Sequence, residues 1–154
     1  MIWSDKLIKE TGVVKPMINE LVQPNSYDIR LDKTILVQNI FGKWKKKTLP
    51  YKLKRGKFIL GSSIERVSLP NGVCAMVDGK STLARKGVTV HQTAGWIDTG
   101  FNGNITLELG CLTKKIKLEE GMRIGQIVFM DSYECDNVYN GHYQNQEGVT
   151  KAWS

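Results

Sequence analysis

After its first twelve residues, the chain is a succession of short apolar segments bounded by Gly, Pro, Asn, Asp or Ser. Within them, Val, Ile, Leu and Tyr alternate with polar residues, which is the period of a β-strand. Such short strands, spaced roughly 8–12 residues apart, predict a mainly β fold, either a barrel or a double-sheet jelly roll. The segments are 26–31, 33–40, 57–70, 72–79, 87–94, 104–110, 114–120 and 123–130.

One short helix is predicted near the N-terminus, over residues 5–11 (DKLIKET). Ser4 is placed to cap its first turn, and Trp3 and Ile8 are spaced as a hydrophobic staple. Gly12 is placed to end it, because glycine readily adopts the left-handed conformation found after a helix. We therefore expect a β domain with a single N-terminal helix.

Length and composition are those of one globular domain. With 154 residues, of which 41% are apolar, we expect a single domain over 1–154 with a modest core. No segment approaches the roughly 18 consecutive apolar residues that span a bilayer, and the N-terminus lacks the apolar stretch of a secretory signal. We therefore expect a cytoplasmic protein without a membrane partner.

The cysteines and histidines give no support to a metal or disulfide framework. Cys74, Cys111 and Cys135 are odd in number and widely spaced, so we expect free thiols packed in the core. No CxxC pair occurs, and His91 and His142 are far apart in the sequence, which leaves a structural zinc site without its usual ligand spacing.

The net charge of +7 is concentrated in one segment. Residues 43–57 hold eight Lys or Arg and no acidic residue, and removing those eight charges leaves −1 for the rest of the chain. Three explanations stay open: a nucleic-acid site, a patch that attracts a polyanionic small substrate, or a solvated hairpin whose lysines keep an exposed strand from pairing with other chains. We favour the solvated hairpin and expect no nucleic-acid partner.

Two segments carry groups suited to chemistry. In 91–109 (HQTAGWIDTGFNGNITLEL), glycines at 95, 100 and 103 predict a loop, and the alternation that follows directs Glu108 away from the apolar face. Glu108 therefore faces either water or a site. Segment 78–87 (DGKSTLARKG) combines Gly, Lys, Arg and two hydroxyls, a set that binds phosphate, although it lacks the glycine spacing of a P-loop.

Five blocks together resemble the dCTP deaminase branch of the dUTPase superfamily, in order and in spacing, over nearly the whole chain. The resemblance implies a distorted jelly-roll subunit, the dUTPase-like β-clip, and a homotrimer whose active sites lie between subunits. The blocks are QPNSYDIRL (23–31), DGKSTLARKG (78–87), HQTAGWIDTGFNGNITLEL (91–109), GMRIGQIVF (121–129) and YNGHYQNQEG (139–148).

The resemblance also implies catalytic roles. Glu108 would be the acid/base, taking a proton from the water that attacks cytosine C4 and delivering protons to N3 and the departing ammonia. Ser81 and Arg85 match the pair that positions this water, the base and Glu108. Asp98 matches the residue that binds the deoxyribose 3′-hydroxyl, and in dUTPases the corresponding aspartate orients the water that attacks the α-phosphate.

Further positions match residues that bind the nucleotide, including a tail, 139–154, that closes over the triphosphate; a frayed terminus would have a similar composition. The backbone around His91, Thr93 and Ala94 would distinguish an amino from a keto group. The chain departs from the family at His142, where Lys is usual, and at Lys80, where Arg is common. The matched positions are Lys80, Thr82, His91, Thr93, Ala94, Trp96, Gln126, Tyr139, His142 and Gln146.

Three classes of function are compared. The first is a dCTP deaminase that stops at dUTP or continues to dUMP and pyrophosphate. The second, a pure dUTPase, is disfavoured because an apolar residue would replace Glu108 and the Ser81–Arg85 pair would be missing. A non-catalytic regulator, the third, is disfavoured by the intact site. The segment HQTAGWIDTGF (91–101) resembles the corresponding block of bifunctional family members, so we predict conversion of dCTP to dUMP.

The expected reaction uses no zinc, because the H-x-E…P-C-x-x-C arrangement of zinc deaminases is missing from the sequence. We expect Mg²⁺ to accompany the triphosphate, held by phosphate oxygens and water rather than by protein ligands. Asp28, in SYDIRL, is a candidate to touch that hydration shell, but we expect a structural role for it at the end of a strand.

Overall fold

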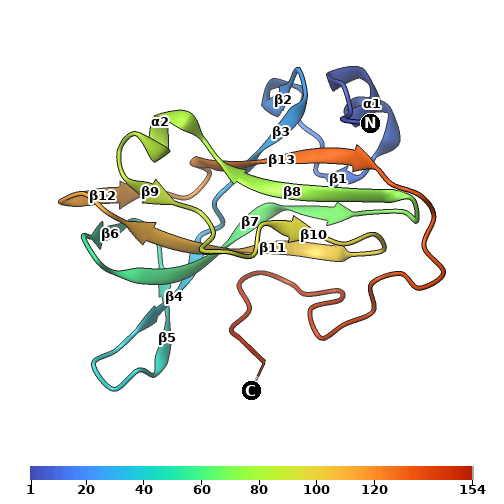
Figure 1. Ribbon diagram of the computed structural model, residues 1–154. Helices are drawn as coiled ribbons and strands as arrows, with labels where there is room; N and C mark the ends of the chain where they lie inside the picture. Colours follow the sequence, from blue (N-terminus) through green and yellow to red (C-terminus); the bar gives the residue numbers. More distant parts are fainter. Residues whose placement is uncertain (154) are drawn as a thin grey trace.

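The computed structural model describes residues 1–153 and is mainly β, with one short helix at the N-terminus (Figure 1). In chain order the elements are α1 (Asp5–Thr11), β1 (Val14–Lys15), the 3₁₀ turn η1 (Asn19–Leu21), β2 (Val22–Gln23), β3 (Ser26–Arg30), β4 (Thr34–Gln38), β5 (Trp44–Thr48), β6 (Tyr51–Lys54), β7 (Phe58–Ser68), β8 (Val73–Gly79), α2 (Ser81–Ala84), β9 (Val88–Thr89), β10 (Trp96–Ile97), β11 (Asn102–Cys111), β12 (Lys115–Leu118) and β13 (Arg123–Asp131).

Two antiparallel sheets form the body of the molecule. One has the strand order β5-β4-β7-β11-β9, with β1 pairing with β7, and the other has the order β10-β8-β13-β3-β2 (Figure 1). Strands β6 and β12 form a separate two-stranded ribbon. Apart from the pairs β4–β5 and β2–β3, neighbouring strands in each sheet are not consecutive in sequence, as in a jelly roll, so the predicted double-sheet β fold is confirmed.

The N-terminal helix is where the sequence pattern predicted it. Gly12, with φ +66°, ends α1, and Trp3 and Ile8 are both buried. Ser4 adopts the extended conformation of an N-cap, but its side chain makes no capping hydrogen bond. The helix is therefore held by its apolar contacts more than by its cap.

Most predicted segments are strands, with three differences. Only residues 88–89 of the segment 87–94 belong to a strand, because the chain then leaves this sheet and continues to β10 of the other sheet. Gly103, predicted in a loop, lies inside β11. The basic segment 43–57 is not one hairpin, since β5 pairs with β4 while β6 pairs with β12.

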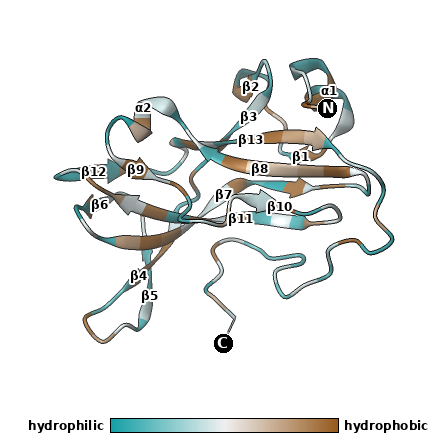
Figure 2. Cartoon of the chain, in the orientation of Figure 1, coloured by the Kyte–Doolittle hydropathy of each residue, from teal (hydrophilic) through white to brown (hydrophobic). Residues whose placement is uncertain are grey.

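The core lies between the two sheets, where the apolar sides of the strands meet (Figure 2). Its largest fully buried side chains include Tyr27 and Phe129 from one sheet and Leu107 and Leu109 from the other. Cys74 and Cys111 are both buried free thiols, but only Cys111 belongs to this core; burial raises the pKa of the Cys74 thiol. Cys135 is exposed, so the prediction of a core position was wrong for this residue.

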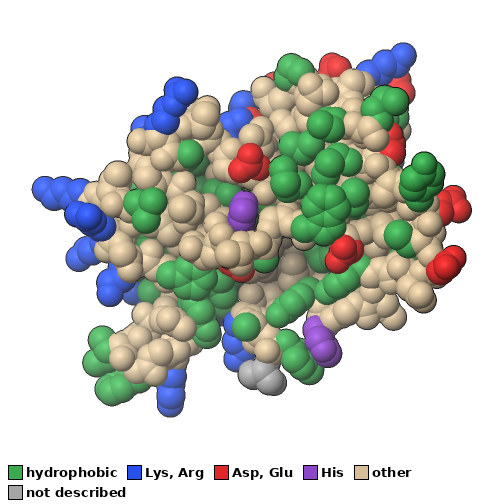
Figure 3. All heavy atoms as spheres, in the orientation of Figure 1, with side chains coloured by type: hydrophobic (Ala, Val, Ile, Leu, Met, Phe, Trp, Pro, Cys, Tyr) green, Lys and Arg blue, Asp and Glu red, His purple; other side chains and the backbone are tan. Residues whose placement is uncertain are grey.

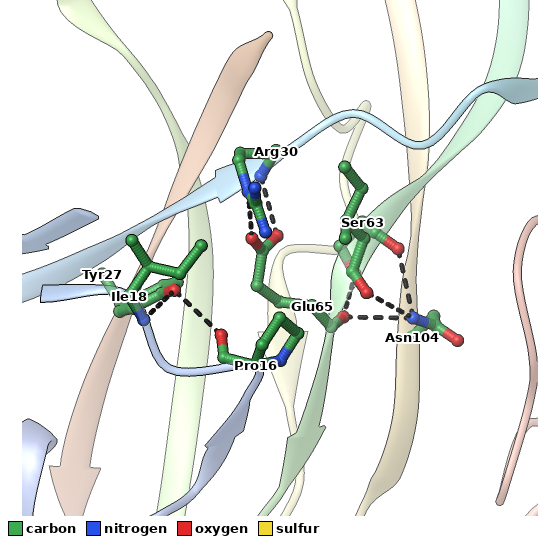
Figure 4. Close-up of polar contacts among 8 residues, drawn as sticks. Pro16, Ile18, Tyr27, Arg30, Ser63, Glu65 and Asn104 are labelled. Atoms are coloured by element: carbon green, nitrogen blue, oxygen red, sulfur yellow. Dashed lines mark hydrogen bonds and ion pairs between the residues drawn. The ribbon is translucent and has the colours of Figure 1, made fainter. Parts of the chain in front are cut away.

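A buried carboxylate joins the sheets (Figure 4). Glu65 of β7 is fully buried and accepts hydrogen bonds from the Arg30 backbone amide at 2.8 Å and from Arg30 Nε at 2.7 Å. Beside it, Asn104 Nδ2 donates to the backbone carbonyls of residues 63–65, where the pairing of β11 with β7 shifts register. These bonds satisfy backbone groups that the irregular pairing leaves without a strand partner.

No helix of residues 1–153 is long and apolar enough to cross a membrane.

Candidate active site

Strand β11 sets the direction of Glu108. Leu107 and Leu109 are buried in the core, so Glu108 between them points to the opposite face of the sheet, where it is half-buried. Its backbone amide donates to Val90 O at 2.9 Å, and its Oε2 accepts a hydrogen bond from the Gln92 backbone amide at 2.8 Å. The loop that follows β9 therefore fixes the orientation of the carboxylate.

The side chain of Gln92 ties this loop to the strand a second time. Its Nε2 donates to Thr89 Oγ1 at 3.1 Å and to the backbone carbonyl of Glu108 at 3.3 Å. Gly110 permits the Thr89 side chain to lie over β11, since a Cβ at Gly110 would be 2.6 Å from Thr89 Oγ1. The sequence motif did not identify Gln92 as part of the site. Its hydrogen bond to the carboxylate is donated by the backbone N–H, a group that every residue except proline possesses.

Glu108 opens into a cleft of about 480 Å³. In Figure 3 the face seen is hollowed between groups of apolar side chains. Asp98 lies in the same cleft as Glu108, so two carboxylates flank one space. Six of the residues predicted from the sequence line it: Ala94, Trp96, Asp98, Glu108, Tyr139 and Gln146.

The C-terminal tail forms one side of the cleft. The Tyr139 backbone amide donates to Thr99 O at 2.8 Å, and the Tyr139 ring packs 5.9 Å from that of Phe101. Gln144 Nε2 donates to Gly100 O at 2.8 Å. A Cβ at Gly100 would lie 2.6 Å from Val138 Cβ, so the close approach of the tail requires a glycine there. The tail is docked on β11 rather than frayed.

His142 belongs to the tail but does not line the cleft. Its ring stacks on that of Trp153, with the centroids 4.5 Å apart and the planes 7° from parallel. His91 and Thr93 are likewise not among the residues that line the cleft, although Ala94 beside them is. His91 Nδ1 is buried and has no hydrogen-bond partner within the described chain.

A second group of predicted residues lies on and beside α2, at the end of the other sheet. Lys80 Nζ contacts Asp28 Oδ1 at 2.5 Å, and Arg123 Nη1 lies 3.5 Å from Asp28 Oδ2. Asp28 is almost fully buried within β3, which fits the structural role expected for it. Gln126 Nε2 donates to Gly79 O at 3.1 Å. These contacts fix the strand positions beneath α2.

Ser81, Thr82 and Arg85 of the α2 region are exposed. Within residues 1–153, their side chains make no hydrogen bond or ion pair, and they do not line the cleft of Glu108. Apart from His91, Thr93 and His142, the predicted residues of one subunit therefore separate into a cleft group and an α2 group, with Lys80 and Gln126 in the latter.

No three His, Cys, Asp or Glu side chains gather as a metal site in the described part of the chain. The polar groups of the cleft are two carboxylates, an amide, a lysine, two threonines and two tyrosines, which suit water activation and hydrogen bonding to an organic substrate.

Comparison with known proteins identifies the relatives of the chain. A family model described as dCTP deaminase-like matches residues 3–132. A protein of Methanoregula boonei named "dCTP deaminase, dUMP-forming" is 39% identical, with 88% of this chain and 82% of the relative covered. A protein of the same name from Thermobifida fusca is 38% identical, with 100% and 93% covered.

Solved structures show the same fold at lower identity. The 2′-deoxycytidine 5′-triphosphate deaminase of Agrobacterium tumefaciens superimposes with a TM-score of 0.76 at 22% identity, over 85% of this chain. This chain spans about half of that protein, 48% of its length. A dUTPase of phage phi11 of S. aureus, described with a structural Mg(II) ion, gives a TM-score of 0.57 at 16% identity, covering 83% of this chain and 91% of the other.

Proposed function

Because the chain belongs to the dCTP deaminase-like family, we propose that it removes the amino group of dCTP by hydrolysis and then cleaves the resulting dUTP to dUMP and pyrophosphate. The proposed reaction takes place in the cytoplasm and uses no zinc. The observation that carries the proposal is the pair of Glu108 and Asp98 in one cleft, with Glu108 Oε2 held by a backbone amide. Glu108 Oε1 accepts no hydrogen bond from the described residues, which leaves it available to a water.

Deamination needs one group that moves protons. Glu108 takes a proton from a water as the oxygen attacks C4 of the cytosine, and it passes this proton to N3. It then takes the proton of the new C4 hydroxyl and passes it to the amino nitrogen. The C4–N bond then breaks, ammonia leaves, and C4 keeps the oxygen as a keto group. The fixed Gln92 amide keeps the carboxylate from rotating between these transfers.

Pyrophosphate release needs a second water. Asp98 lies exposed on the wall of the cleft, where its carboxylate orients a water toward the α-phosphate or accepts a hydrogen bond from the sugar hydroxyl. The bond that breaks joins the α- and β-phosphates, so dUTP and water give dUMP and pyrophosphate. Mg²⁺ would be held by the phosphate oxygens and water rather than by protein ligands.

A homotrimer would complete the site. Ser81 and Arg85 lie outside the cleft of their own subunit but remain exposed, so they are free to enter the cleft of another copy. The partner subunit's Arg85 would then add positive charge to a cleft in which Lys151 is the one basic residue among the described lining residues. The single domain, 1–154, would contribute its tail, 139–154, as the element that closes over the triphosphate.

The test is the Glu108→Gln variant. The amide keeps the size and hydrogen-bonding capacity of the side chain but cannot cycle a proton, so ammonia release from dCTP should fall by about 10²–10⁴ while dCTP binding stays within a fewfold of wild type. Glu120→Gln, at an exposed position outside the cleft, is the matched control and should keep full activity. Turnover of Glu108→Gln within tenfold of wild type would remove Glu108 from the mechanism.

A further inference from the structure

One wall of the cleft consists of three apolar side chains that take no part in the steps of the proposed reaction. This apolar wall is formed by Trp44 of β5 and by Phe58 and Leu60 of β7. The Trp44 and Phe58 rings pack edge to face, with centroids 6.1 Å apart and planes 63° from parallel. The two rings brace each other, so neither is free to swing away from a bound substrate.

Strand pairing places this wall beside the proposed acid/base. Leu60 is the register partner of Glu108 in the antiparallel pair of β7 and β11. Partners of this kind project from the same face of a sheet with Cβ atoms about 4.5–5.5 Å apart. An atom that contacts the Glu108 carboxylate therefore also lies near Leu60.

Phe58 continues the wall from the same strand. Its register partner is Gly110, which offers no side chain to cover the ring. Phe58 is 39% exposed, and the exposed part borders the cleft. An aromatic surface is therefore open to the substrate next to the reacting centre.

The chemistry of a pyrimidine decides which of its edges can meet this wall. In a cytosine ring with C4 at Glu108, one neighbour of C4 is N3, which must receive a proton and needs polar groups. The other neighbour is C5, and the C5–C6 edge carries only C–H bonds. An apolar edge can pack on an apolar wall without leaving any polar group unpaired, whereas N3 placed against the wall would lose its hydrogen bonds.

We propose that Phe58, supported by Trp44, contacts the C5 edge of the pyrimidine and selects against a substituent at C5. This specificity rests on the proposed deamination at Glu108. A methyl group on C5 would need space that the braced rings occupy, and overfilling a packed contact is unfavourable. Truncating the ring supplies that space.

The experiment compares kcat/KM for 5-methyl-dCTP and dCTP in wild type, Phe58→Ala and Trp44→Ala. The ratio of the two values should rise about tenfold in Phe58→Ala, the order expected for one methyl group in an apolar site, and less in Trp44→Ala. Phe41→Ala is the matched control, because Phe41 is 79% exposed at the turn between β4 and β5 and does not line the cleft. Its ratio should equal that of wild type.

The outcomes separate this inference from the proposed function. If wild type converts dCTP but the ratio in Phe58→Ala stays within twofold of wild type or falls, the C5 contact is refuted and the deamination proposal stands. If wild type releases no ammonia from dCTP, both are refuted. The ratio of Kd values for the two nucleotides in a Glu108→Gln background should shift in the same direction without turnover.

Two further controls exclude structural effects. Phe58→Leu is the milder variant to use if Phe58→Ala does not fold, and it should raise the ratio in the same direction by a smaller factor. If Phe58→Ala elutes as a smaller species than wild type in size-exclusion chromatography, the ring lies in a subunit interface and the proposed contact with the base is wrong.

Discussion

Gln146 and Asn104 are joined by two hydrogen bonds. Gln146 Nε2 donates to the Asn104 backbone carbonyl at 2.6 Å, and the Asn104 backbone amide donates to the Gln146 backbone carbonyl at 3.1 Å. The tail is thereby attached to the same strand that carries Glu108. Gly103 lies directly beneath the contact, where a Cβ would be 3.0 Å from Gln146 Cγ and 3.1 Å from Gln146 O.

The first prediction is that Gly103→Ala loosens the tail. A methyl group at this position must displace the backbone of Gln146. KM for the nucleotide should therefore rise several-fold and kcat should fall, which are the changes we also expect if residues 139–154 are deleted. Limited proteolysis should cut the variant within 139–153 faster than wild type. Wild-type kinetics together with an unchanged cleavage pattern would mean that this docked position does not matter for catalysis.

The second prediction concerns the lysines of β5. Lys45, Lys46 and Lys47 are exposed, and the residues proposed to contact phosphate lie on other elements. Changing all three to Gln should therefore leave kcat/KM within about twofold of wild type at low salt, and neither protein should bind DNA. A drop of about fivefold or more that shrinks as ionic strength rises would instead show that β5 steers the triphosphate.

The third prediction concerns the ion pair of Asp28 and Lys80. The Asp28 side chain is 1% exposed, so its charge depends on Lys80 at 2.5 Å and on Arg123 at 3.5 Å. Lys80→Met should reduce the free energy of unfolding by about 3 kcal/mol, because it strips a buried carboxylate of its nearer partner. Urea denaturation measures this loss.

The matched variant is the double change Asp28→Asn with Lys80→Met, which removes both charges. It should recover most of the lost stability, since no unpaired charge remains buried. Equal stability of Lys80→Met and wild type would mean that Arg123 alone suffices for Asp28.

The sequence pattern correctly predicted those elements whose conformation is determined by residues close to one another along the chain. The alternation around Glu108 predicted both the strand and the outward direction of the side chain, because period-two burial is a property of neighbouring residues. The same holds for α1, where Gly12 supplies the left-handed residue that ends the helix. The predicted approach of Asp98 and Glu108 came from the family resemblance, and the structure places both in one cleft.

The features missed by the sequence depend on partners far along the chain. Gly103 resembled a loop residue, but the tail more than forty positions later accounts for the glycine inside β11. Strands β5 and β6 were expected to pair with each other, whereas β4 and β12 are their partners. Gln92 acts through its backbone amide, which carries no residue-specific signal.

A single incubation tests most directly whether this chain performs both hydrolyses. The purified protein is incubated with dCTP and Mg²⁺, and nucleotides, ammonia and pyrophosphate are quantified over time. We predict that dUMP, ammonia and pyrophosphate appear in equal amounts, and that Glu108→Gln releases no ammonia above about one hundredth of the wild-type rate. Accumulation of dUTP without pyrophosphate would contradict the second hydrolysis, and unchanged dCTP would contradict the deamination.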